Sequence, residues 1–387
     1  MDSSRRINQR MAELGHSEIR AMTQACVAVA GLNMAQGVCD TPVPPIVLKA
    51  AAEAMTQGKN TYSRFDGLAE LRETLAVKLV RDNDIHADPE TEITVSAGAT
   101  GSFHAACLAL LNPGDEVIVF EPFYQYHVSA LLAVQAVPVV VTLAAPDWTL
   151  IAESVERALT PRTRAIVVNS PGNPSGKVFS REELETVARM ATDHNLLIVT
   201  DEIYEYFLYD GRRHVSMASL PGMAERTITI GGYSKTFSIT GWRIGYSVAA
   251  RQWSQAIGAM NDLLYVCAPT PLQAGVAAGI RELPDSFYRQ LAKEYQQKRD
   301  RFCAALAQAG LPPAVPQGAY YVLADATRLP GRNGKDRAMH ILKTAGVAGV
   351  PGDAFFVGPE GSRYIRFSYA KTDDDLDEAC RRIARLP

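Results

Sequence analysis

From about residue 93 onward, short β-branched runs bounded by turn residues alternate with segments of helical periodicity. The first such unit runs from a strand at 93–96 through a helix to a strand at 117–120, and further apolar runs predict strands at 165–169, 196–200 and 227–230. Alternating strands and helices indicate parallel βαβ units, and near-continuous apolar strands are covered on both faces. The pattern predicts an α/β fold with a large, doubly wound, mainly parallel sheet.

The two flanks of this region have a different texture. Segment 67–81 places leucines at helical spacing between charged residues, which predicts an amphipathic helix. After residue 284, a long charged helix at 290–309 is followed by Gly/Pro-rich turns and short strands near Tyr320 and Ile365. We expect a smaller α+β domain there, to which the chain's beginning folds back. The predicted division is an N-terminal segment packing with the small domain (1–40), a large domain (41–284) and a small C-terminal domain (285–387).

Composition narrows the class of function. The 387 residues are 47% apolar, and 39 Lys and Arg against 42 Asp and Glu give a net charge of -3, so no basic surface for nucleic acid is expected. The apolar run 130–145 is broken by Gln135 and Pro138 and is too short to span a membrane. Six scattered cysteines without metal-ligand spacing, and a polar N-terminus, predict a cytoplasmic protein without a metal site.

Several familiar motifs are absent or incomplete. Segment 172–178 resembles a Walker loop, but its glycine spacing is one residue short and Val178 stands where the magnesium-binding hydroxyl belongs. No GxGxxG, HExxH or GxSxG sequence occurs. ATP binding, dinucleotide binding, zinc proteolysis and serine hydrolysis therefore lack their minimal chemistry.

The most informative residue is Lys235, which follows a predicted buried strand among small residues, with Arg243 eight positions later. A lysine at the carboxyl end of such a strand points into the crevice where α/β proteins bind ligands. A lone lysine in this place is more often an ordinary surface residue. The small hydroxyl neighbours and the spaced arginine favour an amine held near an anion.

Four segments together resemble the class I and II aminotransferases, which are pyridoxal-phosphate enzymes of fold type I, including the aspartate and kynurenine aminotransferases. Segment 232–245 matches the family's lysine signature, 173–176 its Asn-Pro-x-Gly, 201–204 its Asp-Glu-x-Tyr and 364–368 its arginine strand. The segments follow one another in the family's order over nearly the whole chain. The resemblance implies that Lys235 binds pyridoxal 5'-phosphate as a Schiff base.

The resemblance also assigns roles at the cofactor ring. Asp201 would pair with the pyridinium nitrogen and keep it protonated, which preserves the ring as an electron sink. Tyr204 and Asn173 would hydrogen-bond the phenolic oxygen and so make the lysine easier to displace. Lys235, Asp201 and Tyr204 are thus the expected catalytic residues.

The cofactor phosphate needs backbone donors and a cation. The turn of Gly98, Ala99 and Thr100 opens a predicted helix, whose free N–H groups and dipole favour an anion. Arg243 would supply the cation. Ser234 is close enough in sequence to add a hydroxyl, although many relatives carry this serine two residues earlier.

Two tyrosines complete the expected cofactor site. Tyr124 aligns with the aromatic residue that stacks on the ring in the family, and Tyr62 resembles the tyrosine that reaches the phosphate of the partner subunit. Ordinary packing is the alternative for both. If Tyr62 has this role, the protein is a homodimer with shared active sites.

Arg366 suits the substrate α-carboxylate because a guanidinium forms two parallel hydrogen bonds with it. Gly37 and Asn173 would complete this contact, and Phe355 would form an apolar wall of the side-chain pocket. Segment 36–42 departs from the family's Gly-x-Pro-Asp pattern, with Cys39 in place of proline. The substrate of well-known relatives therefore cannot simply be carried over.

The predicted function is an aminotransferase of subclass EC 2.6.1, which moves the α-amino group of an L-amino acid to a 2-oxo acid. Its partners are these small molecules, with no nucleic acid or membrane. An alternative is a lyase or cyclase acting at the β or γ carbon on the same scaffold, since the motifs around Lys235 do not separate them. A non-catalytic regulatory protein is disfavoured because the chemistry-bearing residues occur together. The donor amino acid, the preferred 2-oxo acid and any assembly beyond a dimer stay open.

Overall fold

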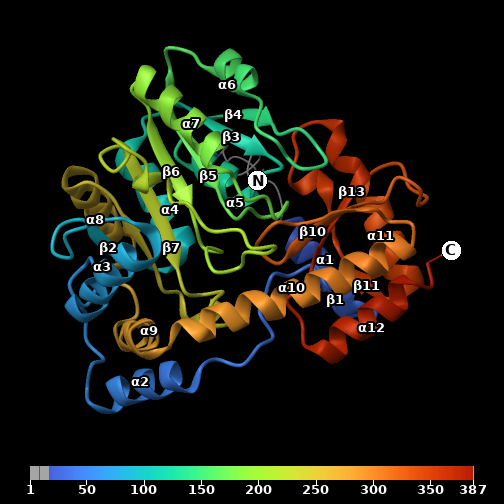
Figure 1. Cartoon of the computed structure of the whole chain (residues 1–387), viewed down its shortest axis with the longest axis horizontal. Coiled ribbons are helices and arrows are strands. Elements are labelled where there is room, and N and C mark those ends of the chain that lie inside the picture. Colours follow the sequence, from blue (N-terminus) through green and yellow to red (C-terminus); the bar gives the residue numbers. More distant parts are fainter. Residues whose placement is uncertain (1–7, 9–16, 387) are drawn as a thin grey trace, which may run out of the picture.

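The computed structural model describes residue 8 and residues 17–386. At its centre lies a seven-stranded sheet with the order β2-β8-β7-β6-β5-β3-β4 (Figure 1). Its strands are β2 (Ile93–Ser96), β3 (Glu116–Glu121), β4 (Val137–Thr142), β5 (Thr163–Asn169), β6 (Leu197–Asp201), β7 (Thr227–Gly232) and β8 (Gly245–Val248). Neighbouring strands are parallel, except that β8 runs antiparallel to β2 and β7. The predicted α/β fold with a mainly parallel sheet is confirmed.

Helices cover both faces of this sheet. They are α2 (Pro45–Thr56), α3 (Ala69–Asn83), α4 (Gly98–Leu110), α5 (Gln125–Ala133), α6 (Ala152–Ala158), α7 (Arg181–Asp193), α8 (Arg251–Tyr265) and α9 (Thr270–Glu282). Val117 and Val119 of β3 pack in one cluster with residues of α4 and α8, whereas Ile118 and Phe120 pack in another with residues of α7. Alternate side chains of a strand point to opposite faces, so the sheet is doubly wound.

The strand β8 was not predicted from the sequence. The five apolar runs are all strands, and their observed bounds differ from the predicted ones by at most two residues. The first predicted unit, 93–120, is not a pair of adjacent parallel strands. Its strand β2 pairs with β8 and not with β3. Gly245 lets β8 approach the start of α4, since a Cβ there would lie 2.4 Å from the amide nitrogen of Ala99.

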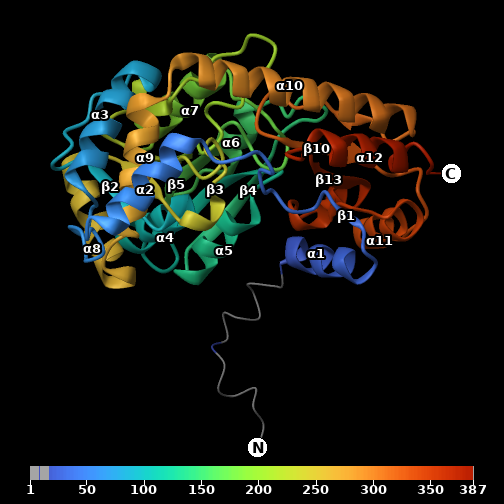
Figure 2. The same cartoon turned by 90° about the horizontal axis from the view of Figure 1, so that it is seen from below.

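The C-terminal part surrounds a four-stranded antiparallel sheet with the order β12-β13-β10-β9. The long helix α10 extends along the molecule from near α9 to α12 (Figures 1 and 2). The elements of this part are α10 (Asp285–Gln308), β9 (Pro313–Ala314), β10 (Tyr321–Asp325), α11 (Gly334–Ala345), β11 (Val347–Ala348), β12 (Val350–Pro351), β13 (Tyr364–Ser368) and α12 (Asp373–Ile383).

The first described elements lie against this C-terminal part. Strand β1 (Leu32–Asn33) pairs in parallel with β11, and α1 (Glu18–Ala28) packs beside it (Figure 2). Of the predicted N-terminal segment 1–40, residues 1–7 and 9–16 lie outside the described residues. The domain boundaries after residues 40 and 284 stay a prediction.

Segment 130–145 contains the end of α5 and the strand β4. Among the residues that the structure describes, no helix is both long and apolar enough to cross a membrane. The amphipathic helix predicted at 67–81 is α3, which begins at Ala69 and buries Leu71, Leu75 and Leu79. Its register is therefore the predicted one.

Candidate active site

The candidate active site is a cavity of about 430 Å³ at the carboxyl ends of β5, β6 and β7. In parallel sheets these ends form the crevice in which ligands bind. Side chains from β10 and β13 of the C-terminal part line the opposite wall. The predicted residues that line the cavity are Gly37, Ala99, Thr100, Tyr124, Asn173, Asp201, Tyr204, Ser234, Lys235, Arg243 and Arg366.

Lys235 lies three residues beyond the end of β7, and its amine faces the cavity. Its Nζ donates a hydrogen bond to the carbonyl oxygen of Gly37 at 3.2 Å and lies 6.0 Å from the centre of the Tyr320 ring. Among the described residues, no carboxylate forms an ion pair with this amine. The amine is thus held by one weak acceptor and is available to react with a ligand.

Asp201 is the last residue of β6 and is buried. Its Oδ2 lies 2.9 Å from Nε2 of His127 on α5, and its Oδ1 accepts a hydrogen bond from the amide of Ile203 at 3.2 Å. The His127 ring itself packs 4.5 Å from the centre of the Phe103 ring. These contacts fix the direction in which the carboxylate points into the cavity.

Tyr204 and Asn173 do not contact each other in this structure. The Tyr204 hydroxyl lies 3.0 Å from that of Tyr321, and burial raises the pKa of Tyr204 well above its ordinary value. The backbone N–H of Asn173 donates to Oδ1 of Asn169 at 2.9 Å. The side-chain Oδ1 of Asn173 accepts a hydrogen bond from Arg366 at 3.0 Å. Both side chains border the same cavity.

Arg366, in the middle of β13, is 1% exposed. Its Nη1 and Nη2 donate to Asn173 and to the carbonyl of Ala35, while its Nε has no hydrogen-bond partner within the described part of the chain. The guanidinium lies between the rings of Tyr321 and Phe355, at 4.5 and 4.9 Å from their centres. Burial lowers the pKa of Arg366 from its ordinary value. A buried cation without a counter-charge is suited to bind an anion.

A second anion site lies at the start of α4. Gly98 has φ +79° in the left-handed region, and no side chain caps this helix, so its first N–H groups are open to a ligand. The Arg243 guanidinium is so close that a Cβ on Gly98 would lie 2.4 Å from its Nη2. Arg243 donates to the carbonyl of Thr240 at 2.8 Å, and Ser234 borders the cavity nearby. Helix start, cation and hydroxyl thus face one another.

Tyr124 immediately precedes α5 and borders the cavity. Its ring stacks on Tyr126 at 5.1 Å and meets the edge of His127 at 5.3 Å. Burial raises the pKa of Tyr124, so its hydroxyl stays protonated. The ring is therefore fixed on the same side of the cavity as His127.

Three predicted residues are not among those that line this cavity: Gly98, which lies beside the lining residue Arg243, Phe355 and Tyr62. Phe355 was expected to form a wall of the substrate pocket, but it is fully buried behind Arg366 and only supports that guanidinium. Its backbone carbonyl accepts a hydrogen bond from the amide of Phe123 at 3.0 Å. Tyr62 is 80% exposed on the single chain and has no part in this chain's own cavity.

Sequence reasoning missed two residues at the centre of the site. His127 lies three positions after Tyr124, which is one helical turn, so helical spacing from that tyrosine could have indicated it. Tyr321 leaves no comparable signal, because it meets Tyr204 and Gly37 only through the pairing of β10 with β13. A Cβ on Gly37 would lie 1.8 Å from the Tyr321 hydroxyl oxygen, so glycine is required there.

A family model described as aminotransferase class I and II matches residues 29–383. The chain belongs to this family. Class I and II aminotransferases depend on pyridoxal phosphate and transfer an amino group from an amino acid to a 2-oxo acid. The chain is therefore an aminotransferase of subclass EC 2.6.1, as the motifs predicted.

Individual relatives with aminotransferase names are matched over most of their length. A probable N-succinyldiaminopimelate aminotransferase of Mycobacterium tuberculosis is 36% identical over 377 residues, which cover 94% of this chain and 94% of that protein. Kynurenine–oxoglutarate transaminase 3 of Rattus norvegicus is 34% identical and is matched over 90% of this chain and 83% of its own. The solved N-succinyldiaminopimelate aminotransferase from Mycobacterium tuberculosis has a TM-score of 0.95 at 34% identity, over 98% of this chain and 100% of that chain.

Proposed function

We propose that this aminotransferase works with pyridoxal phosphate held in the cavity beside Lys235. When bound, this cofactor supplies an electron sink for negative charge at the substrate Cα. Three observations support the fit: an amine without a carboxylate partner, a buried carboxylate on Asp201, and an anion site between the start of α4 and Arg243. They match the aldehyde, the ring nitrogen and the phosphate of the cofactor.

The cofactor ring would be held by four side chains. Lys235 would bind it covalently through Nζ. Asp201, oriented by His127, would keep a proton at the ring nitrogen, while Tyr204 and Asn173 would donate to the phenolic oxygen. The hydrogen-bonded position of Asp201 in a buried setting supports this role, because a fixed carboxylate stabilises a cation most strongly away from water.

The phosphate would be held at the start of α4. Backbone N–H groups of Gly98, Ala99 and Thr100 would donate to it, Arg243 would supply the positive charge and Ser234 a hydroxyl. The left-handed φ of Gly98 and the absence of a capping side chain support this assignment. Tyr124 would stack on the face of the cofactor ring. Its position beside His127 in the cavity supports this role.

The substrate would be an L-amino acid whose α-carboxylate binds Arg366. The unpaired Nε of this buried guanidinium is the single observation that carries the proposal, because leaving a buried cation without an anion is costly. Asn173 and Gly37 would complete the contact. The free amine of Lys235 would take the proton from the substrate Cα. It would return this proton to the cofactor carbon on the same face.

We infer that the protein acts as a homodimer with shared active sites. Tyr62 is 80% exposed, and the neighbouring apolar side chains Phe65, Leu263 and Val266 are 39%, 79% and 42% exposed. A hydrogen bond of 2.8 Å from Thr270 to the carbonyl of Thr61 holds these two segments together. Exposed apolar side chains in neighbouring segments are typical of an interface, and such an interface would carry Tyr62 to the phosphate site of the partner subunit.

We also infer a cytoplasmic location. The six cysteines are free thiols, four of them buried. Burial raises the pKa of the Cys107 and Cys303 thiols, which makes them poor nucleophiles. Unpaired cysteines are usual in a reducing compartment.

The test replaces Lys235 by alanine. The wild-type protein, purified with pyridoxal phosphate, should show the visible absorbance of a Schiff base, and a single turnover with an amino acid should yield the 2-oxo acid. Lys235→Ala should lose this absorbance and lower kcat by about 1000-fold or more. Replacement of the exposed Lys343 should change neither. A near-normal rate in Lys235→Ala would contradict the proposal, and so would release of the amino group as free ammonia without formation of the aminated cofactor.

A further inference from the structure

A second cavity, of about 700 Å³, adjoins the active-site cavity. Four residues line both: Arg20 of α1, Thr100 of α4, and Tyr126 and Ala130 of α5. The two cavities are therefore neighbours, separated by no more than these shared side chains. Its volume lies within the range of about 300–1,000 Å³ that is usual for small-molecule sites.

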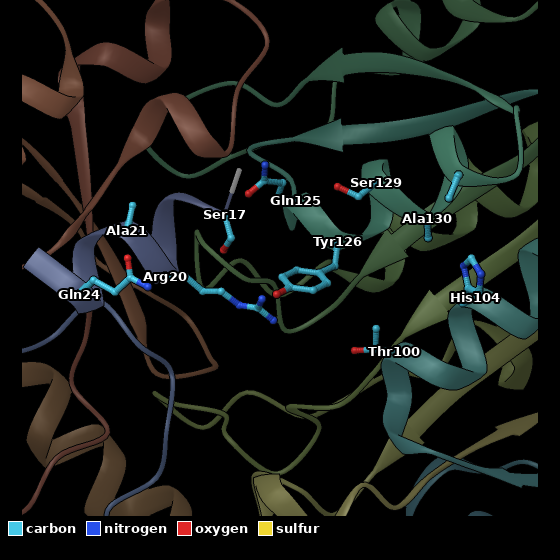
Figure 3. A pocket seen from close by; sticks show the side chains of 11 residues that line it. Ser17, Arg20, Ala21, Gln24, Thr100, His104, Gln125, Tyr126, Ser129 and Ala130 are labelled. Carbon is cyan, nitrogen blue, oxygen red and sulfur yellow. The ribbon is translucent and has the colours of Figure 1, made fainter. Parts of the chain in front are cut away.

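Arg20 is the cation at the junction of the two cavities. Figure 3 shows its side chain extending from α1 toward Tyr126, across the space between α1 and α5. The position of α1 is fixed, since Met22 and Cys26 on its other face are 0% and 1% exposed. Glu18, the nearest acid in sequence, is bound to Lys335 and so does not neutralise Arg20.

No acidic residue that the structure describes lines the outer cavity. Within the described part of the chain, no ion pair involves Arg20. The remaining lining combines alanines with neutral polar residues, among them Ser17, Gln24, Gln125 and Ser129 (Figure 3). Such a surface attracts an anion and offers hydrogen bonds along the way.

Arg64, by contrast, is not available for a ligand. Its Nε and Nη2 bind Asp66 at 2.5 and 2.7 Å, and its Nη1 binds Glu90 at 2.8 Å. The charge of Arg64 is thus compensated within its own chain.

We propose that Arg20 is a specificity-determining residue that binds a carboxylate at the far end of an extended amino-acid donor. The inference rests on the proposed function: Arg366 takes the α-carboxylate in the inner cavity, and the side chain of the donor runs past Tyr126 into the outer cavity. Two cations at separate places in adjoining cavities select a substrate with two acidic ends. A diacid too short to reach from Arg366 to Arg20 gains nothing from the second cation.

The experiment uses the enzyme purified with pyridoxal phosphate and compares Arg20→Gln, Arg20→Lys and the control Arg332→Gln, which removes an arginine outside both cavities. The donors are L-aspartate, L-glutamate, L-2-aminoadipate and L-2-aminopimelate, with neutral L-norleucine for reference. Arg20→Gln should lower kcat/KM for the two longer diacids about 5- to 30-fold, mainly through KM. Norleucine should change less than twofold, Arg20→Lys should retain part of the preference, and Arg332→Gln should behave as wild type.

A binding measurement separates this inference from the proposed function. Pimelate has two carboxylates but no amine, so its affinity, measured by calorimetry, does not depend on turnover. Arg20→Gln should weaken pimelate binding by a similar factor. Equal losses for diacids and norleucine, a wild-type enzyme that does not favour diacids, or unchanged pimelate binding would overturn the role of Arg20. If no amino acid yields a 2-oxo acid while pimelate binding still depends on Arg20, the proposed function fails instead.

Discussion

Single side chains in this site act through neighbours that the sequence did not indicate. Asp201 could be predicted because it ends an apolar strand, and Lys235 because it follows another. His127 contacts Asp201 only after α5 has packed against the sheet, so its role follows from tertiary structure. The unpaired Nε of Arg366 likewise depends on the neighbours that β13 acquires in the folded chain.

We expect His127→Leu to lower kcat by about tenfold, because Asp201 loses the group that orients its carboxylate. His127→Asn keeps a polar nitrogen and should retain more of the rate. The pH dependence of the Schiff-base absorbance is the second readout, since a change confined to packing would leave it unmoved. Equal rates in both variants and wild type would show that His127 does not position Asp201.

Among the elements, the strands were predictable and their neighbours were not. A buried parallel strand is recognisable in the sequence as an apolar run, and β5, β6 and β7 are each such a run. The short strand β8 contains Gly245 and Ser247, and its place between β2 and β7 is set by contacts distant in sequence. The position of Phe355 could not be predicted for the same reason, because only the folded loop brings its ring against Arg366.

The turn after β6 contains a buried ion pair behind the active site. Glu202 lies 2.6 Å from Nε2 of His214 and accepts from Ser216 at 2.6 Å and from Thr200 at 3.0 Å. Burial alone would raise the pKa of Glu202 and lower that of His214. The opposite charge and the hydrogen bonds outweigh it, so the pKa of Glu202 is lowered and that of His214 is raised.

This pair should stabilise the fold most between about pH 4.3 and pH 6.5, the ordinary pKa values of Glu and His. Its contribution is lost as the pH falls through the lowered pKa of Glu202, and as it rises through the raised pKa of His214. In this window, Glu202→Gln should reduce the free energy of unfolding by about 3 kcal/mol in urea titrations. Glu182→Gln, on the exposed face of α7, is the control. A loss that does not vary with pH would contradict the assignment.

At the scale of the whole molecule, the active site borders both parts of the chain and, in our proposal, a second copy.

Leu263→Glu changes a side chain that is 79% exposed on the single chain, so it should not affect folding of the monomer. In a dimer it would bury a charge and separate the subunits. Sedimentation velocity should therefore show dimers for wild type and monomers for Leu263→Glu, with weaker retention of pyridoxal phosphate. Val315→Glu, 60% exposed on the C-terminal part, is the control. A monomeric wild type would refute the shared site.

The carbonyl of Gly37 accepts hydrogen bonds both from Lys235 and, at 3.2 Å, from Tyr320. Covalent chemistry at the amine removes one of these two donors and leaves the Tyr320 hydroxyl. The segment between β1 and α2 keeps its other contacts, among them the ion pair of Asp40 with Lys371 at 2.7 Å and the hydrogen bond from the Asp40 amide to the carbonyl of Ala370. The chemical state of the lysine therefore changes the hydrogen bonding of a single carbonyl, in a stretch of chain whose backbone is held elsewhere.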